Sequence, residues 1–396
     1  MKRIISVILL CCALLSLCAC GRKHKEETGL LRIGVLEPMS GEYAAQGLRE
    51  ALGVQYANNE KPTVRLNGKT YRIDLMIADN ESDPVRSAEA AQGLVDAGCA
   101  VVIGSYGAEL SKAASDVFLR AGVPAIAASC DDPSVTSGND HYFRIGALPE
   151  LQGSVLASFA KKKLGVKCVY CLIRSGSGED AALARSFRST AEALGIKVVT
   201  AEFPANTVDF TPYLSAAREE DAGAIYAPCE IQYGQLLIGQ MELTEKERED
   251  KKSLPPVLAD ARWQDKEILN ALEEKAVSVY STAAYAEGGN AQFDESFVNW
   301  LRDSSEAFAS NGANDIVSAE SVLGYDAYYT ALAAVESAGS ADHADILAIL
   351  PSVSHDGVSG SVSFDADGGA VRSGMWVLKA APKTQSWESM GQVKAG

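Results

Sequence analysis

The sequence predicts an α/β protein with two similar lobes, each built on a parallel β-sheet with helices on both faces. Apolar stretches of strand length alternate with helical stretches from residue 31 onward, and this alternation restarts after residue 163. A chain of 396 residues also exceeds what one hydrophobic core usually supports. Together these observations favour two doubly covered sheets over a single domain.

The first series of elements opens with an apolar strand at 31–36 and a helix in which Leu48, Leu52 and Tyr56 share one stripe. At 71–77, apolar and polar residues alternate, which is typical of a half-buried strand. The series continues with a helix at 84–97, a strand at 100–104, a helix at 108–120 and a strand at 123–127.

A helix at 150–163 leads into the second series. Its strands are expected at 167–173, 197–203, 224–227, 256–259 and 277–283, with helices between them. The rest of the chain is expected to form helices at 291–309 and 318–338 and a final pair of strands at 358–364 and 375–379.

The first twenty residues have the features of an export signal. Lys2 and Arg3 precede an apolar run over 4–17 that is short for a membrane-spanning helix. The run ends in Leu17-Cys18-Ala19-Cys20, which resembles a bacterial lipoprotein signal, where the final cysteine is acylated and begins the mature protein. We expect a signal at 1–19, a lipid on Cys20 and a polar tether at 20–29. An ordinary cleaved signal with incidental cysteines is the alternative.

The charge and the hydropathy of the chain restrict which kinds of molecule it can bind. The chain carries 36 Lys and Arg against 52 Asp and Glu, a formal net charge of −16. Such an acidic surface argues against nucleic acid and against direct binding to anionic lipid. After residue 20, no apolar run has the length of a membrane span.

The cysteines beyond the signal are expected to be buried free thiols. Apart from Cys20, the proposed lipid site, they are five, an odd number that cannot all pair. Cys168 and Cys171 have the spacing of a redox pair but lie inside an apolar strand, where residues three apart face opposite sides. The sequence leaves open the redox state of Cys99, Cys130, Cys168, Cys171 and Cys229.

Ordered motifs along 31–380 carry a family resemblance. The motifs are Gly34-Val-Leu-Glu-Pro-Met-Ser-Gly41, Asp79 with Asp83-Pro84, Val101-Val-Ile-Gly-Ser105, Tyr142-Phe-Arg-Ile-Gly146 with Gln152-Gly153, Tyr325-Asp-Ala-Tyr328, Gly357-Val-Ser-Gly360 and Phe364-Asp-Ala-Asp-Gly368. In this order and spacing the chain resembles type I periplasmic solute-binding proteins, of the branch named for leucine, isoleucine and valine binding.

The resemblance implies two Rossmann-like lobes with parallel sheets joined by three crossovers, the type I periplasmic binding protein fold. The crossovers would fall near 147–150, 281–284 and 354–357. The N-terminal lobe would then comprise 30–148 plus 284–355, and the C-terminal lobe 149–283 plus 356–392.

Enzyme signatures are scarce in this chain. It has no HExxH, GxSxG or GxxxxGK[ST] motif, and the glycine-rich turn at 175–178 lacks the spacing of a dinucleotide fingerprint. Asp131 and Asp132 could be paired catalytic carboxylates, but a turn with a helix-capping Asp before Pro133 is the simpler interpretation. We therefore expect no enzyme activity, no catalytic residue, no cofactor and no metal.

In open parallel sheets, ligands bind beyond the carboxyl ends of the strands. The loops at these ends are 39–45, 105–109 and 128–132 in the first lobe and 174–179, 228–232 and 260–264 in the second. The candidate ligand-binding residues on them are Tyr43, Ser105, Tyr106, Ala108, Ser129, Cys130, Asp131, Ser177, Cys229, Glu230 and Asp260.

Two of these groups have an expected role with an amino-acid ligand. Backbone N–H groups from Ser105 to Ala108, and at Ser129 and Cys130, could hold a carboxylate at a helix start. The resemblance implies that Asp260 pairs with the ligand ammonium, because amino-acid-binding relatives carry an acidic residue at that position. Capping of the following helix is the alternative for Asp260.

The chain also departs from the family pattern. Relatives that bind branched-chain amino acids commonly place aromatic side chains where this sequence has Ser177 and Cys229, and a hydroxyl residue near Asp131. The cleft would therefore be roomier and richer in acid, including Glu230, which favours polar or cationic ligands. Arg174 acts in the opposite direction, since it could neutralise an acid or bind a carboxylate.

The expected function is an extracytoplasmic solute-binding lipoprotein of an ABC importer. It would be a monomer, close by hinge motion around an amino acid or a similar small polar metabolite, and pass it to permease subunits. A ligand-sensing receptor component with the same fold is the alternative. The sequence leaves open the ligand, and whether the anchor lies on the outer cell surface or on the periplasmic side of a membrane.

Overall fold

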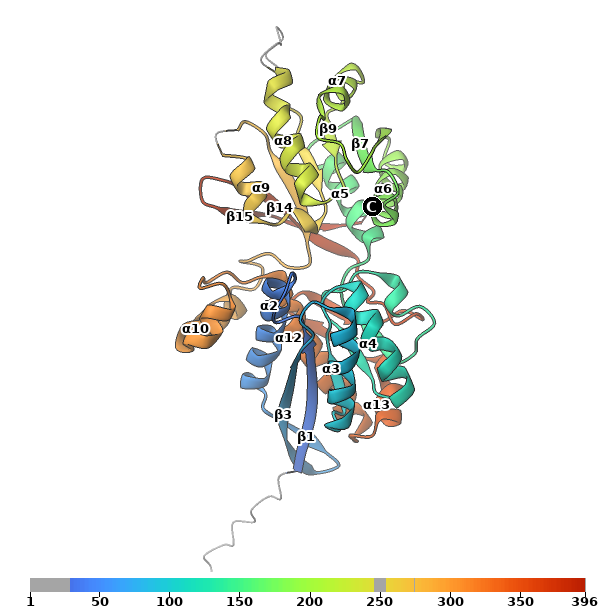
Figure 1. Cartoon of the computed structure of the whole chain (residues 1–396), viewed down its shortest axis with the longest axis vertical. Helices are drawn as coiled ribbons and strands as arrows, with labels where there is room; N and C mark the ends of the chain where they lie inside the picture. The colour runs from blue at the N-terminus through green and yellow to red at the C-terminus, as the bar shows by residue number, and fades with distance from the viewer. Residues whose placement is uncertain (1–28, 246–253, 274, 396) are drawn as a thin grey trace, which may run out of the picture.

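The computed structural model describes residues 29–245, 254–273 and 275–395. It shows two α/β lobes, one above the other along the long axis of the molecule (Figure 1). The predicted signal, Cys20 and all of the tether except Gly29 lie outside the described residues. No helix within the described ranges is long and apolar enough to cross a membrane.

The first lobe contains a six-stranded sheet in the order β2-β3-β1-β4-β5-β6. Neighbouring strands are parallel except β2 and β3, which form an antiparallel hairpin at one edge. The strands are β1 (Gly29–Glu37), β2 (Thr63–Leu66), β3 (Lys69–Asp79), β4 (Val101–Ile103), β5 (Ala125–Ala127) and β6 (Tyr142–Arg144).

Helices cover both faces of this sheet. They are α2 (Ala44–Glu60), α3 (Pro84–Asp96), α4 (Ala108–Ala121), α10 (Ala291–Asp303), α11 (Ser305–Ser310), α12 (Ala319–Ala338) and α13 (His343–Ile349). Ile33 and Val35 of β1 pack in one apolar cluster with α2 and α12, whereas Leu36 packs in another with α3 and α4. Helices α2 and α12 approach so closely that a Cβ at Gly53 would lie 1.8 Å from the carbonyl oxygen of Ser321.

The second lobe contains a seven-stranded sheet in the order β15-β14-β11-β10-β9-β7-β8. Its first five strands in sequence are parallel, β14 pairs antiparallel with β11, and β15 pairs antiparallel with β14 at the edge. The strands are β7 (Cys168–Arg174), β8 (Lys197–Phe203), β9 (Ala224–Tyr226), β10 (Val257–Ala259), β11 (Val279–Ala283), β14 (Gly374–Ala381) and β15 (Ser386–Lys394).

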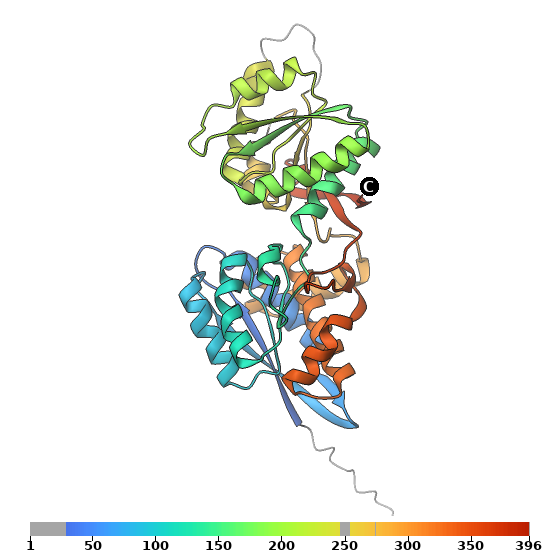
Figure 2. The ribbon, with the colours of Figure 1, turned by 90° about the vertical axis from the view of Figure 1, so that its right-hand side faces the viewer.

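Two layers of helices flank this second sheet (Figure 2). Its helices are α5 (Pro149–Lys162), α6 (Gly178–Ala193), α7 (Thr211–Glu219), α8 (Ile231–Glu245) and α9 (Lys266–Ala271), with a short 3-10 turn η2 (Ala261–Trp263) before α9. Leu156 of α5 and Phe187 of α6 pack on one face of the sheet. Leu214 of α7 and Leu237 of α8 pack on the other, so the predicted two-lobe α/β fold is confirmed.

The chain passes between the lobes three times. The first passage joins β6 to α5, and the second lies between Ala283, which packs with Leu378, and Ala284, which packs in the first lobe. The third lies between Ala370, buried in the first lobe, and Met375, buried in the second. This is later than the expected crossover at 354–357.

The difference at the third passage has a physical reason. Residues 354–363 form a hairpin of β12 (Ser354–Gly357) and β13 (Gly360–Ser363). The family resemblance had implied that the chain returns to the second lobe within this segment. Val362 of this hairpin is buried in the core of the first lobe, and Phe364 packs edge-on against Phe143. The segment 356–370 therefore belongs to the first lobe, and only β14 and β15 return to the second.

Candidate functional site

The carboxyl ends of the two parallel sheets face each other. Gln152, at the start of α5, joins them: its amide nitrogen donates to Asp131 in the first lobe at 3.3 Å. Its amide oxygen accepts from the backbone N–H of Ala261 at 3.2 Å and the hydroxyl of Thr282 at 2.9 Å, in the second lobe. We call the loops that follow the parallel strands of both lobes, around this junction, the interlobe face.

Two tyrosines lie on the first lobe's side of the interlobe face. Tyr43 follows β1 and is 39% exposed, and Tyr106 follows β4. Their ring centroids are 6.1 Å apart, with the planes tilted by 45°. The loop of Tyr43 is held in place by Ser82, whose hydroxyl accepts from the Tyr43 backbone N–H at 3.0 Å and donates to the carbonyl of Ser40 at 2.7 Å.

Two of the donors expected to hold a ligand carboxylate, the backbone N–H groups of Ser105 and Tyr106, already have partners. The backbone N–H of Tyr106 donates to Glu37 at 2.8 Å, and that of Ser105 donates to the hydroxyl of Tyr142 at 3.1 Å. The hydroxyl of Ser105, a fully buried residue, accepts from the amide of Asn80 at 2.8 Å. These bonds hold the loop that positions Tyr106 and occupy the backbone donors of Ser105 and Tyr106.

Two buried acids support this loop from below. Glu37 ends β1 and Glu50 lies on α2, and both side chains are fully buried. Their carboxyl groups hydrogen-bond to each other, and the hydroxyl of Ser129 donates to Glu50. Burial raises the pKa of Glu50 to about 7, and burial and the charge of Glu50 raise the pKa of Glu37 well above its usual value. One shared proton therefore satisfies this pair.

Asp131 of the first lobe contacts the second lobe through the amide of Gln152. Burial, then the nearby charge of Asp260, raises the pKa of Asp131 to about 6. The neighbouring Cys130 is a buried free thiol, and burial raises its pKa to about 12. Ala108, at the start of α4, offers a backbone N–H and no side-chain donor.

In the second lobe Asp260 forms an ion pair within the protein. Its two carboxylate oxygens accept from Nε and Nη2 of Arg262 at 2.8 and 2.9 Å, and one of them also caps η2 by accepting from the Arg262 backbone N–H at 3.0 Å. Asp260 therefore has the helix-capping role that the sequence left open as an alternative to ligand binding. A ligand ammonium could reach Asp260 only if Arg262 moved, because the charge of Asp260 is already balanced.

Further acids surround Arg262. Its guanidinium lies 3.1 Å from Asp180, which is fully buried at the start of α6, and 3.1 Å from Glu179. Burial raises the pKa of Glu179 to about 7, while Arg262 opposes that rise.

The remaining candidates also have internal contacts. Arg174, after β7, lies 2.7 Å from Glu230, so this acid is paired. The hydroxyl of Ser177 caps α6 by accepting from the Asp180 backbone N–H at 3.2 Å. Cys229 is buried, and its carbonyl accepts from the indole N–H of Trp263 at 2.6 Å.

Several residues of this face were not among the sequence candidates: Arg262, Asp180, Glu179, Gln152, Glu37 and Glu50. Glu37 could have been found, because it ends the first strand just as Ser105 and Asp260 follow theirs. Arg262 lies in the loop 260–264 named from the sequence, but its contact with Asp180 joins residues 82 positions apart and had no sequence signal.

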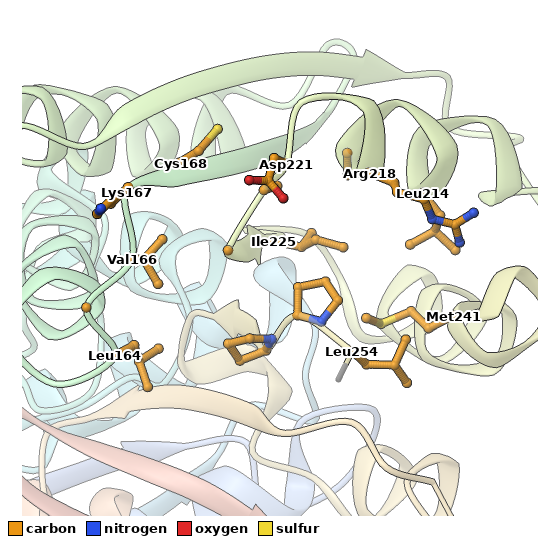
Figure 3. A pocket seen from close by; sticks show the side chains of 16 residues that line it. Leu164, Val166, Lys167, Cys168, Leu214, Arg218, Asp221, Ile225, Met241 and Leu254 are labelled. Atoms are coloured by element: carbon orange, nitrogen blue, oxygen red, sulfur yellow. The ribbon is translucent and has the colours of Figure 1, made fainter. Parts of the chain in front are cut away.

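Two cavities lie away from this face. The larger, about 540 Å³, is at the amino ends of β7, β9 and β10, and apolar side chains such as Val166, Ile225 and Met241 line it beneath Arg218 and Asp221 (Figure 3). The smaller, about 270 Å³, lies in the first lobe between α12 and β12. Within the described ranges, no group of three or more His, Cys, Asp or Glu side chains is arranged to hold a metal ion.

Comparison with known proteins gives a family match over most of the chain. A sequence model of the family described as periplasmic binding protein matches residues 31–385. A "Leu/Ile/Val-binding protein homolog 6" from Brucella melitensis is 24% identical over 357 residues, which cover 89% of this chain and 88% of that protein. An "amino acid binding protein" from Pseudomonas aeruginosa is 29% identical over 198 residues. This match and those to two further curated relatives span only about half of each relative's length.

Solved structures with the same fold have varied ligands. A leucine-binding protein from Thermotoga maritima has a TM-score of 0.71 at 25% identity and covers 92% of this chain, with 99% of its own chain covered. A solute-binding protein from Rhodopseudomonas palustris BisB5, solved with 3,4-dihydroxybenzoic acid, has a TM-score of 0.69 at 19% identity, with 92% and 98% covered. The fold is thus shared by proteins whose ligands differ in charge and shape.

Proposed function

The chain belongs to the periplasmic binding protein family, and from this membership we propose that it is the extracytoplasmic solute-binding component of an ABC importer. It binds a small polar metabolite such as an amino acid between its lobes and delivers it to permease subunits. The observation that carries the proposal is the interlobe face, where polar loops from both sheets meet at Gln152. In this fold, such loop clusters at the carboxyl ends of strands are where ligands bind.

Binding between the lobes would couple the ligand to a change of shape. The lobes are joined by three chain passages, and the side-chain hydrogen bonds of Gln152 bridge them at the interlobe face. A ligand that contacts both lobes prefers the closed arrangement and shifts the population toward it. The closed form then presents a surface that the permease can distinguish from the empty protein.

The experiment that tests this proposal is a thermal-shift screen of the mature protein against amino acids, amines, aromatic acids and other small metabolites. A ligand that binds only the folded state adds about 2.7 kcal/mol of stability at a hundredfold excess over its Kd. We expect at least one class of small metabolite to raise the melting temperature in a saturable manner. A screen in which no small metabolite does so would contradict solute binding.

We also propose that Cys20 anchors the protein to a membrane as a lipoprotein, and that it acts as a monomer. The support is the sequence 17–20 and the polar segment that follows it. Cys20→Ala is expected to release the protein from the membrane fraction or to block removal of the signal. Cys18→Ala, two residues earlier in the same segment, is the matched control and should stay membrane-bound. Unchanged membrane association of Cys20→Ala would refute the anchor.

A further inference from the structure

We propose that the ligand is a small organic cation, whose ammonium group lies against Tyr43 and Tyr106 and next to Asp131. This inference rests on the proposed function, because it assigns a ligand class to the same interlobe face. It is carried by four features: an aromatic pair among acids, acids on both lobes within electrostatic range of each other, a buried hydroxyl without a partner, and two anion donors that are occupied within the protein.

The first feature is the tyrosine pair. The Tyr43 and Tyr106 rings lie 6.1 Å apart on loops that follow two neighbouring strands, and Tyr43 is 39% exposed. The charged groups that act most strongly on the Tyr106 hydroxyl are all carboxyl groups: Glu320, Asp131 and Glu50. Aromatic faces set among carboxylates attract organic cations, because the negative ring face and the acids act in the same direction.

The second feature is the placement of acids on both lobes. Asp131 of the first lobe lies within electrostatic range of Asp260 and Glu179 of the second. Closing the lobes would bring these like charges closer, which opposes closure unless a positive charge lies between them. A cationic ligand relieves this repulsion, whereas an anionic ligand adds to it.

The arginines of the second lobe do not neutralise all the carboxylates of the interlobe face. Arg262 contacts three acids, Asp260, Asp180 and Glu179, and Arg174 contacts Glu230 at 2.7 Å. Asp131 accepts a hydrogen bond from the uncharged amide of Gln152 at 3.3 Å, and Arg262 and Arg144 act on it only from within electrostatic range. Asp131 is therefore an acid of this face without a direct ion pair in the described part of the chain.

A third feature is the hydroxyl of Tyr226, at the end of β9. Tyr226 is fully buried, and its hydroxyl has no hydrogen-bond partner among the described residues. It lies within electrostatic range of Asp260, Arg262 and Asp180. A buried hydroxyl without a partner is costly, so this polar group lies near the charged residues of the second lobe with unused hydrogen-bonding capacity.

The fourth feature is the state of the anion donors in the first lobe. The backbone N–H groups of Ser105 and Tyr106 donate to Tyr142 and Glu37, and the hydroxyl of Ser129 donates to Glu50. A ligand carboxylate that used the Ser105 and Tyr106 N–H groups would have to displace these partners and would lie near the buried acid pair. These two donors therefore favour a ligand without an anionic group at this position.

The test is isothermal titration of the mature protein with choline, putrescine and spermidine, and with L-leucine and 4-hydroxybenzoate as a zwitterion and an anion. We expect at least one of the three cations to bind, with an affinity that falls as salt is raised. Asp131→Asn should weaken this binding at least about tenfold, equal to 1.4 kcal/mol. Asp132→Asn removes one charge from the adjacent, more exposed residue, which pairs with Lys112, and should change the affinity less than about threefold.

The tyrosines are tested by paired substitutions. Tyr106→Leu should weaken cation binding about tenfold, whereas Tyr106→Phe, which keeps the ring, should retain most of the affinity. Circular dichroism of each variant shows whether the fold is intact.

The outcomes separate this inference from the proposed function. Binding of leucine or 4-hydroxybenzoate without any cation would overturn the inference and leave solute binding intact. Cation binding that Asp131→Asn and Tyr106→Leu do not weaken would also overturn it. If none of the three cations binds, the inference fails, and the wider thermal-shift screen then decides the proposed function by itself.

Discussion

Among single residues, the buried carboxyl groups of Glu37 and Glu50 have the most unusual environment. Each is fully buried, and each has one oxygen that no donor other than its partner's shared proton satisfies. Tyr106 and Ser129, which donate to the pair, lie on the interlobe face. The pair therefore ties the end of β1 and the middle of α2 to the loops that would contact a ligand.

This pair predicts a specific dependence of stability on pH. The folded state holds the shared proton more tightly than the unfolded chain, because the folded pKa of Glu50 is about 7 against 4.5 in its usual environment. The contribution of the pair to the free energy of unfolding is therefore fully present below about pH 4.5 and is lost as the pH rises through about 7. The groups around the pair are Ser129, Glu320 and the backbone of Tyr106 and Ala128.

Glu37→Gln should remove much of this loss. The glutamine amide can donate permanently to Glu50, so the variant should be more stable than the natural protein at pH 8 by about 1–3 kcal/mol, the usual cost of an unpaired buried acceptor. At pH 4.5 the two should differ little. Urea unfolding at both pH values measures this, with the exposed Glu42→Gln as control. A Glu37→Gln variant less stable than the natural protein at pH 8 would show that the pair shares no proton.

The sequence predicted which loops form the interlobe face better than it predicted what their side chains do. The rule that ligand-site residues follow strands brought Ser105, Ser129, Asp131 and Asp260 together, because parallel strands end at the same edge. It could not predict that Arg262 neutralises Asp260, since that contact depends on the η2 turn and on Asp180 from a distant helix.

Among the elements, the helices and strands with strong periodicity were predicted closely. The helix expected at 84–97 is α3 at 84–96, and the strand expected at 197–203 is β8 with the same bounds. The edge strand β2 was missed, although Asn67-Gly68 is a typical hairpin turn, with φ values of 48° and 83°. The helix expected at 291–309 is interrupted at Ser304, whose side chain caps α11 by accepting from the Ala307 backbone N–H at 3.2 Å.

One helix fixes the chain before its third passage between lobes. Asp326, fully buried on α12, accepts from the backbone N–H groups of Val358 and Ser359 at 2.8 Å each, and from the Ser359 hydroxyl at 2.5 Å. Arg372 donates to the carbonyl and hydroxyl of Ser359 and to the carbonyl of Ile145. These bonds explain why the hairpin of β12 and β13 stays with the first lobe.

Asp326→Ala should therefore be strongly destabilising. It leaves two buried N–H groups and one hydroxyl without their acceptor, which costs about 3 kcal/mol or more. Thermal unfolding measures the effect, with Asp356→Ala as control, because Asp356 is exposed and accepts a hydrogen bond from the nearby Ser361 hydroxyl. A change of less than about 1 kcal/mol at Asp326 would contradict this anchoring role.

At the scale of the whole molecule, the fold class and the two-lobe arrangement were predicted, but the third passage was placed too early. Strand periodicity alone does not say which sheet a hairpin packs against, and only the burial of Val362 and Ala370 in the first lobe decides it. Some of the acidic residues that give the chain its negative charge lie on the interlobe face. Asp131 of the first lobe and Glu179 of the second repel each other across the interlobe face, while Arg262 attracts both.

Small-angle X-ray scattering of the mature protein, with and without a saturating ligand found by thermal shift, tests the central claim most directly. The claim is that a solute binds between the lobes and draws them together around the three chain passages. The account predicts a smaller radius of gyration and a shorter maximum dimension for the bound protein. A scattering profile that does not change at saturation would contradict it, because the ligand would then bind within one lobe without closure.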